Sequence, residues 1–168
     1  PKPTATGTPK PTAVPTATPE PTPADGALFQ AEDLTLSENV KIENTKSGFM
    51  GSGYINFPSD NGSAILAGID GGIGGTTTLS IRYALSDDVG RTGTLKINGE
   101  ATDLFMADTG SWQEWATINL DIELEAGVNT IAIESTADDL GNIDEILLGT
   151  NLGAPSTPEP TATPEPTP

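Results

Sequence analysis

Hydrophobic and polar residues alternate strictly over much of the middle of the chain. In Thr77–Leu85 and again in Ala116–Leu124, every second residue is apolar. The segments around Leu95 and Ile131 repeat the pattern, and helical periodicity is not sustained for three turns anywhere in the sequence. A period of two places successive side chains on opposite faces of a β-strand, whereas a helix requires a period near 3.6. The pattern therefore predicts strands with one face in a core and the other in water.

Turn-forming residues separate these segments. Asn98-Gly99, set between two alternating runs, is a strong indicator of a two-residue hairpin. Further Gly-, Asn- and Asp-rich turns lie at 59–62, 71–75, 87–90, 126–127 and 139–141. Short strands with regular turns, about nine or ten here, are typical of antiparallel β-sandwiches and barrels. We expect an all-β fold, an antiparallel β-sandwich of the jelly-roll type.

The two ends of the chain have a different composition from the middle. Residues 1–24 contain eight prolines and seven threonines, and residues 154–168 repeat this Pro/Thr pattern. Such tracts carry too little apolar surface to offset the entropy of ordering, and they favour extended polyproline II. We expect linkers at 1–24 and 154–168 around one folded domain at 25–153. A domain between two linkers indicates a tethered part of a larger protein.

The amino-acid composition excludes several classes of function. Cysteine and histidine are both absent, which excludes disulfides, thiolate and imidazole metal sites, and catalysis through Ser–His or Cys–His pairs. Residues 25–153 carry 21 acidic against five basic side chains. Nucleic acid and anionic membranes are therefore poor partners, because phosphate binding requires a basic surface. Some of the carboxylates could instead bind a hard cation such as calcium.

Five short motifs follow one another in an order that suggests a family. They are Gln30–Glu32, Gly51–Phe57, Arg82–Ala84, Thr109–Thr117 and Gly141–Ile146. With these motifs the chain resembles the carbohydrate-binding modules of families 6 and 35 over most of residues 27–149, with Gly53–Phe57 closer to family 35. The resemblance implies a non-catalytic, secreted, monomeric bacterial jelly roll. Its expected partners are a poly- or oligosaccharide and a tethered hydrolase, lyase or esterase that acts on plant or algal cell walls.

The first candidate site is a calcium site. Gln30 and Glu32 lie two residues apart on a predicted strand, so their side chains share one face. The resemblance implies that Gln30, Glu32 and Asp144 hold a structural Ca²⁺, with loop carbonyls near Lys46–Phe49 completing the oxygen shell. Gln30 stands where many relatives have Glu, which lowers the charge of the site. The alternative is that the two acids are solvated residues at strand edges.

The second candidate site binds sugar. A pyranose needs an aromatic ring against its C–H face and a few oriented polar groups around its hydroxyls. The resemblance implies stacking by Tyr54 and Trp112 and a hydrogen bond from Asn142. The alternative for Trp112 is a rim residue that covers the end of the sandwich. Trp115 is the rival aromatic residue, and its position in the alternation places it outside the main core.

The sequence leaves other functions, and other roles for single residues, open. The same sandwich could serve as an adhesive protein–protein module, and a carboxylate hydrolase ranks last because nothing resembles a catalytic motif. Arg91 could meet a uronic acid or pair with Asp87 or Asp88, and the second role is favoured. Arg82 is interpreted as structural or solvated. The sequence leaves galactosides, mannans, xylans, uronates and algal glycans open as ligands.

Overall fold

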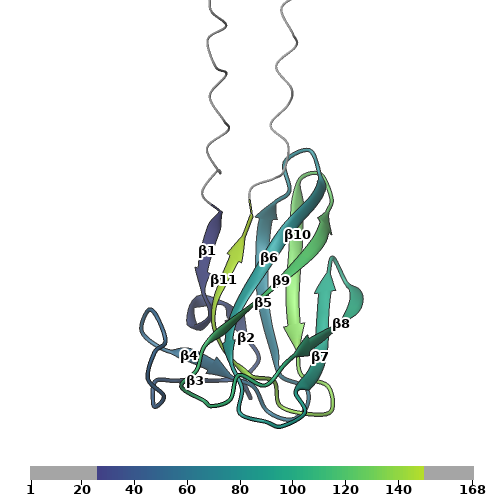
Figure 1. Ribbon diagram of the computed structural model, residues 1–168. Helices are drawn as coiled ribbons and strands as arrows, with labels where there is room; N and C mark the ends of the chain where they lie inside the picture. Colours follow the sequence, from purple (N-terminus) through teal and green to yellow (C-terminus); the bar gives the residue numbers. More distant parts are fainter. Residues whose placement is uncertain (1–25, 150–168) are drawn as a thin grey trace, which may run out of the picture.

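The computed structural model describes residues 26–149, so the two predicted linkers and the outermost residues of the predicted domain lie outside the described part. Eleven strands and one short 3-10 helix make up the fold (Figure 1). They are β1 (Ala27–Gln30), η1 (Ala31–Asp33), β2 (Thr35–Leu36), β3 (Lys41–Glu43), β4 (Tyr54–Asn56), β5 (Ser63–Asp70), β6 (Gly75–Ala84), β7 (Arg91–Ile97), β8 (Glu100–Met106), β9 (Ala116–Leu124), β10 (Val128–Glu134) and β11 (Asn142–Leu148).

The strands form two antiparallel sheets that pack face to face. The six-stranded sheet has the order β3-β4-β11-β6-β9, with β1 also paired to β11. The five-stranded sheet has the order β2-β5-β10-β7-β8. The predicted all-β antiparallel sandwich is confirmed. More strands are present than expected because β2 and β3 have only two and three residues, too few for an alternating pattern to show.

The alternation decides which side chains enter the core. On β6, Leu79, Ile81 and Tyr83 are buried, and the residues between them face outward. Their partners Leu120, Ile118 and Ala116 lie opposite on β9. Burying one such aliphatic side chain stabilises the fold by about 1.5–3 kcal/mol relative to exposure. Arg82, between Ile81 and Tyr83, therefore lies on the outer face of the six-stranded sheet.

The predicted hairpin at Asn98-Gly99 is confirmed. Ile97 pairs with Glu100 across the turn, and the two turn residues have φ angles of 51° and 90°. Positive φ at both central residues is required by the tight turn whose twist matches that of the strands. Asn tolerates this left-handed conformation and Gly adopts it without a steric penalty.

Several connections between strands gather at one end of the sandwich, opposite the end where β1 starts and β11 finishes (Figure 1). Among them are the β3–β4, β6–β7 and β8–β9 connections, so the predicted site residues converge on this end from distant parts of the sequence. Within residues 26–149, there is no helix with the length and apolarity needed to cross a membrane.

Candidate functional site

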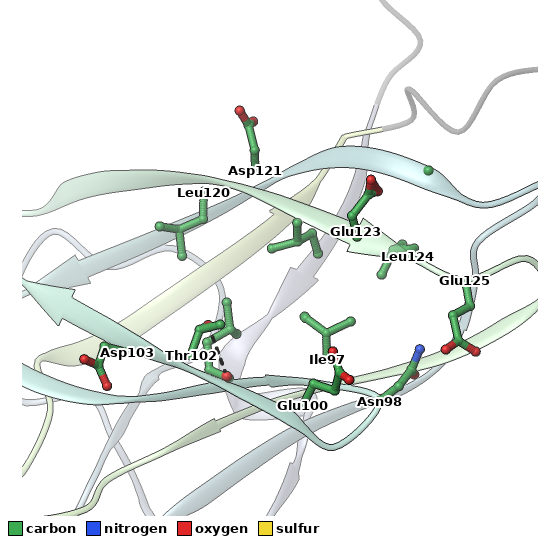
Figure 2. A pocket seen from close by; sticks show the side chains of 13 residues that line it. Ile97, Asn98, Glu100, Thr102, Asp103, Leu120, Asp121, Glu123, Leu124 and Glu125 are labelled. Carbon is green, nitrogen blue, oxygen red and sulfur yellow. Dashed lines mark hydrogen bonds between the residues drawn. The ribbon is translucent and has the colours of Figure 1, made fainter.

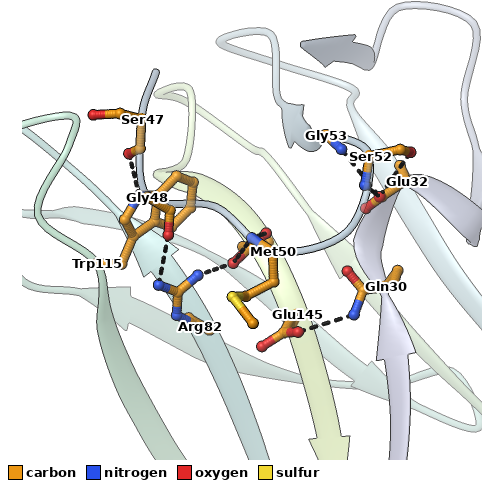
Figure 3. Close-up of polar contacts among 11 residues, drawn as sticks. Gln30, Glu32, Ser47, Gly48, Met50, Ser52, Gly53, Arg82, Trp115 and Glu145 are labelled. Carbon is orange, nitrogen blue, oxygen red and sulfur yellow. Dashed lines mark hydrogen bonds and ion pairs between the residues drawn. The ribbon is translucent and has the colours of Figure 1, made fainter. Parts of the chain in front are cut away.

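The loop between β3 and β4 folds over the outer face of the six-stranded sheet. Two acids hold it there, the buried Asp144 and the half-buried Glu32. The Met50 N–H donates to both carboxylate oxygens of Asp144, at 3.0 and 3.1 Å. The N–H groups of Ser52 and Gly53 donate to Glu32 Oε1 at 2.7 and 3.1 Å (Figure 3). Because N–H donors satisfy carboxylates strongly, these contacts fix the path of residues 50–53.

Two buried oxygen atoms beside this loop have no hydrogen-bond partner within the described residues. They are Gln30 Oε1 and Glu32 Oε2. The Gln30 amide donates through Nε2 to Glu145 Oε1 at 2.9 Å, which leaves its oxygen unused (Figure 3). A buried acceptor without a donor costs about 1–3 kcal/mol, so such atoms call for an explanation, such as an ion.

Gly51 explains how the loop comes this close to the side chains of Gln30 and Glu32. Its φ is +66°, and a Cβ at this position would lie 2.7 Å from Glu32 Oε1 and still closer to Gln30 Oε1. Any side chain would therefore meet both oxygen atoms and would also strain the backbone. The glycine keeps the space between the loop and these oxygen atoms open.

The Glu32 carboxyl is stabilised in its charged form. Burial alone would raise its pKa, but hydrogen bonds from backbone N–H groups and the Ser52 hydroxyl outweigh burial and leave the pKa below its ordinary value.

The prediction that Gln30 and Glu32 lie near each other because they share one face of a strand is wrong. β1 ends at Gln30, and Glu32 lies in η1, so the two side chains approach each other through a helical turn and not along one strand face.

Asp144 is completely buried, and its carboxylate is paired with the Arg82 guanidinium. A β-bulge interrupts the pairing of β11 with β6 between Ile143 and Glu145 and leaves Asp144 unpaired. The carboxylate makes an ion pair with the Arg82 guanidinium, whose side chain is 26 % exposed. This acid is therefore neither a solvated strand-edge residue nor a catalytic group open to substrate.

The donor set fits a hard cation in its chemistry. Gln30, Glu32 and Asp144 supply amide and carboxylate oxygens, which are the ligands that calcium prefers. Among the described residues, no three His, Cys, Asp or Glu side chains gather at one potential metal site, and this set contains only two acids. Two of the carbonyls predicted to complete the shell are engaged elsewhere, since Ser47 O accepts from Trp115 Nε1 at 2.9 Å and Gly48 O accepts from Arg82 at 2.8 Å.

An aromatic cluster adjoins this oxygen-rich region. The rings of Tyr54 and Trp115 lie 5.6 Å apart, and Phe49 meets Tyr54 edge-on at 5.7 Å. Trp115 is half-buried, and the Arg82 guanidinium lies 5.1 Å from the centre of its ring. The ring thus keeps part of its surface at the protein exterior, while Tyr54, Arg82 and the hydrogen bond to Ser47 O fix its orientation.

Tyr54 does not have the exposed ring that the sequence prediction requires. It is 0 % exposed, and its hydroxyl lies 3.1 Å from Thr45 Oγ1 and donates to Glu43 at 3.4 Å. The prediction that Tyr54 stacks directly on a sugar is therefore wrong for this conformation. The Tyr54 ring packs against Trp115 and does not face solvent.

Trp112 and Asn142 occupy different surroundings. Trp112 is half-buried, packs against the hydrophobic core, and has Arg91 5.6 Å from its ring centre. Asn142 begins β11 opposite Ala84 and is 3 % exposed. Trp115 directly precedes Ala116, whose partner is Tyr83, so Trp115 and Asn142 lie at the same end of one sheet, two strands apart. The structure thus joins Trp115, and not Trp112, to Tyr54.

One groove of the molecule has none of these residues in its lining. This groove, of about 820 Å³, opens between the sheet edges β8 and β9 (Figure 2). Leu120, Leu124 and Ile97 point into it, whereas Asp121 points away from it. Its lining contains no aromatic ring among the described residues, so it lacks the stacking surface of a sugar site.

A family model described as carbohydrate binding module (family 6) matches residues 30–150, which includes nearly the whole described domain. The chain belongs to the family 6 carbohydrate-binding modules. The five motifs identified in the sequence lie within or at the edge of this match, and the predicted membership of family 35 or the related family 6 is confirmed.

Solved structures of family 35 modules are also similar to this module. The family 35 module from Paenibacillus barcinonensis superposes with a TM-score of 0.69 at 30 % identity, covering 74 % of this chain and 99 % of that one. A family 35 module in complex with a disaccharide that contains glucuronic acid gives 0.64 at 31 % identity, covering 72 % and 91 %. The sandwich architecture is therefore that of these sugar-binding modules.

Curated relatives carry similar modules within much longer enzymes. Endo-1,4-beta-xylanase B of Cellvibrio japonicus is 37 % identical over 109 residues, which are 62 % of this chain but 18 % of that enzyme. The chain thus spans less than a fifth of this relative's length. The matched segment in the relative is a part of the enzyme, as expected for a module tethered to another domain.

Sequence reasoning missed the role of Arg82 and understated that of Trp115. The alternation of β6 already places Arg82 outward, and the alternation of β9 places Trp115 on the same face. A register between the two strands would have shown that these side chains meet. The special role of Gly51 in the module could not be inferred before the loop was seen against Gln30 and Glu32.

Proposed function

We propose that this module binds a plant cell-wall polysaccharide and holds an attached carbohydrate-active enzyme domain on it, without catalytic activity of its own. Membership of family 6, and the xylanase in which a relative occurs, support this function. The single observation that carries the site is the half-buried Trp115 ring, braced by Tyr54 and Arg82 at the loop end of the sandwich. Because the target polysaccharides lie outside cells, we also propose that the protein is extracellular.

Trp115 is the proposed stacking residue. A fixed indole presents an apolar face to the C–H face of a pyranose at little entropic penalty, because its rotamer is already set. Asn142, at the same end of the sheet, is the proposed hydrogen-bonding partner. Xylan-type oligosaccharides, with and without glucuronic acid, are the first ligands to test, because similar modules occur in a xylanase and in a complex with a glucuronic acid disaccharide.

We further propose that calcium binds beside the β3–β4 loop. Gln30 Oε1 and Glu32 Oε2 are the first ligands, since both are buried and unpartnered, and Asp144 joins them. When bound, the ion supplies positive charge that neutralises these oxygens and ties the loop to the sheet. The chain's own contribution is to bury Asp144, to lower the pKa of Glu32, and to keep space open at Gly51.

Calorimetric titration of an oligosaccharide panel tests the sugar site. Trp115→Ala should weaken binding about tenfold or more, because stacking on one ring contributes about 1.5 kcal/mol. Trp112→Ala is the matched control. It should mainly lower the melting temperature, since that ring packs against the core. If Trp115→Ala binds like the parent while Trp112→Ala loses binding, the site lies at the other tryptophan, and if the parent binds no glycan the function itself fails.

A further inference from the structure

Arg82 lies where the two proposed sites meet, and it is bound on three sides. One guanidinium nitrogen pairs with the buried Asp144, and another donates to Gly48 O at 2.8 Å (Figure 3). The guanidinium carbon of the same side chain lies over the Trp115 ring, 5.1 Å from its centre. One side chain therefore touches a proposed calcium ligand, the covering loop and the proposed stacking ring.

The contacts close a ring of interactions. Trp115 Nε1 donates to Ser47 O at 2.9 Å, and the next carbonyl along the loop, Gly48 O, accepts from Arg82. Two positions later the Met50 N–H binds Asp144, the same carboxylate that Arg82 pairs with. Neither the loop nor the indole can shift without breaking a contact that involves Arg82 or Asp144.

Only an arginine can make these contacts together. Its planar guanidinium offers donors in two directions within the plane and stacks on aromatic rings with its face. A lysine would bring the same charge to Asp144, but its compact ammonium is a single point of charge that cannot also reach the Gly48 carbonyl and lie over the indole. The geometry therefore depends on the fork shape and not on charge alone.

We propose that Arg82 is a positioning residue that couples calcium binding to glycan binding through the loop 47–50 and the Trp115 ring. This inference rests on the proposed function. Residues 50–53 already bind Asp144 and Glu32, and calcium that draws on Asp144, Glu32 and Gln30 restrains them further. Residues 47–50 and the indole then have less freedom left to lose when a glycan arrives. A first ligand that orders what a second ligand needs produces positive cooperativity.

A double titration measures this coupling. Glycan affinity is determined by calorimetry with chelator and with saturating calcium, and calcium affinity with and without saturating glycan. The two factors must be equal by thermodynamic linkage, and we expect the parent to show about fivefold or more. In Arg82→Gln and in Arg82→Lys the factor should fall to within about twofold of unity, even as each ligand alone binds more weakly than it does to the parent.

Arg91→Gln is the matched control. Arg91 also lies over a tryptophan and also pairs with acids, but it has no contact with Asp144. The coupling factor of this variant should equal that of the parent. If Arg82→Lys keeps the parent's factor, or if Arg91→Gln loses it to the same extent, Arg82 has only a general structural role and the proposal is overturned.

A readout without glycan separates this inference from the proposed function. Trp112→Phe leaves Trp115 as the single tryptophan, since the chain has two. Calcium should then shift the emission of Trp115 and reduce its quenching by acrylamide, and Arg82→Lys in the same background should abolish both changes. A parent that binds no glycan but shows this response retains the positioning role and loses the sugar function. A parent whose emission ignores calcium disproves the coupling.

Discussion

Two arginine–tryptophan pairs lie at the loop end of the sandwich, and they differ in what surrounds them. Arg82 lies 5.1 Å from the ring centre of Trp115, and Arg91 lies 5.6 Å from that of Trp112. Both arginines also make ion pairs. The acid of Arg82 is the fully buried Asp144, whereas the side chain of Asp139, one of the acids of Arg91, is 44 % exposed.

The comparison shows that two arginine–tryptophan pairs with the same kinds of contact can have different roles. The Arg91 pair joins the β6–β7 loop, through Asp87, to the β10–β11 loop, through Asp139, and its tryptophan packs on the core. It has the features of a structural clamp. The Arg82 pair adjoins two unpartnered buried oxygens, Gln30 Oε1 and Glu32 Oε2. Unsatisfied acceptors and a half-buried ring beside them are features of a binding site.

The largest expected difference is in how much stability each pair loses when its acid is replaced. With calcium removed by a chelator, Asp144→Asn should lower the free energy of unfolding by about 2 kcal/mol. The substitution leaves the Arg82 charge without its buried partner, and the partial exposure of Arg82 moderates the loss. Asp139→Asn should change stability by less than about 0.5 kcal/mol, because solvent screens an exposed pair. Urea unfolding of both variants measures the difference.

The same two variants also bear on calcium. Asp144→Asn should reduce the rise in melting temperature that calcium causes, whereas Asp139→Asn should preserve it, because a ligand stabilises only the state that binds it. Equal losses of stability in the two variants would show that the two pairs are energetically alike and would remove the basis of the comparison.

A smaller difference is expected at two glycines, one in each region. Gly51 and Gly110 both have positive φ angles, +66° and +89°, but a Cβ at Gly110 would meet nothing within 4 Å. Gly110→Ala should therefore lower stability by about 1 kcal/mol through backbone strain alone. Gly51→Ala should lower it by about 1 kcal/mol more, because its methyl group meets the oxygens of Gln30 and Glu32.

Thermal melts with and without calcium sharpen this test. Gly51→Ala should lose most of the calcium-induced rise in melting temperature, and Gly110→Ala should keep it. If Gly51→Ala responds to calcium as the parent does, the space between the loop and these oxygens is not where the ion binds.

The smallest expected effect is a dependence on pH in the Arg91 region. The Val89 N–H and then the Arg91 guanidinium hold the pKa of Asp87 below its ordinary value. A lowered pKa in the folded state means that the charged Asp87 stabilises the fold above about pH 4 and that this contribution is lost as the pH falls through the folded-state pKa. Asp87→Asn should melt slightly below the parent at pH 7, and the gap should close toward pH 2. A gap that is constant with pH would assign the effect to something other than charge.

Much of the fold could be predicted from local sequence. The alternation in β6 and β9 identified both strands and their core faces, and Asn98-Gly99 identified a hairpin with positive φ at both residues. These features depend on neighbours in the chain, so a single sequence contains them. β2 and β3 were not foreseen, because two or three residues make no pattern.

Less of the site could be predicted. Gln30, Glu32 and Asp144 were named as one oxygen-donor set, but Glu32 arrives from η1 and Asp144 from a bulge. Tyr54 was expected to face a ligand and is completely buried, whereas Trp115, placed outside the core by its position in the alternation, is the ring that joins the cluster. Which aromatic rings touch is a matter of register between strands distant in sequence.

By itself the sequence determined the class of fold, the core face of the long alternating strands, and the kinds of chemistry available, because these follow from the period of the chain and from the side chains it contains or lacks. The tertiary structure alone decided that Arg82 meets Asp144, Gly48 and Trp115 at one point, and that one buried oxygen of Gln30 and one of Glu32 lack donors. The physical reason is that such contacts join segments up to 115 residues apart, as in the hydrogen bond between Gln30 and Glu145. Only the closed sandwich brings these segments within bonding distance.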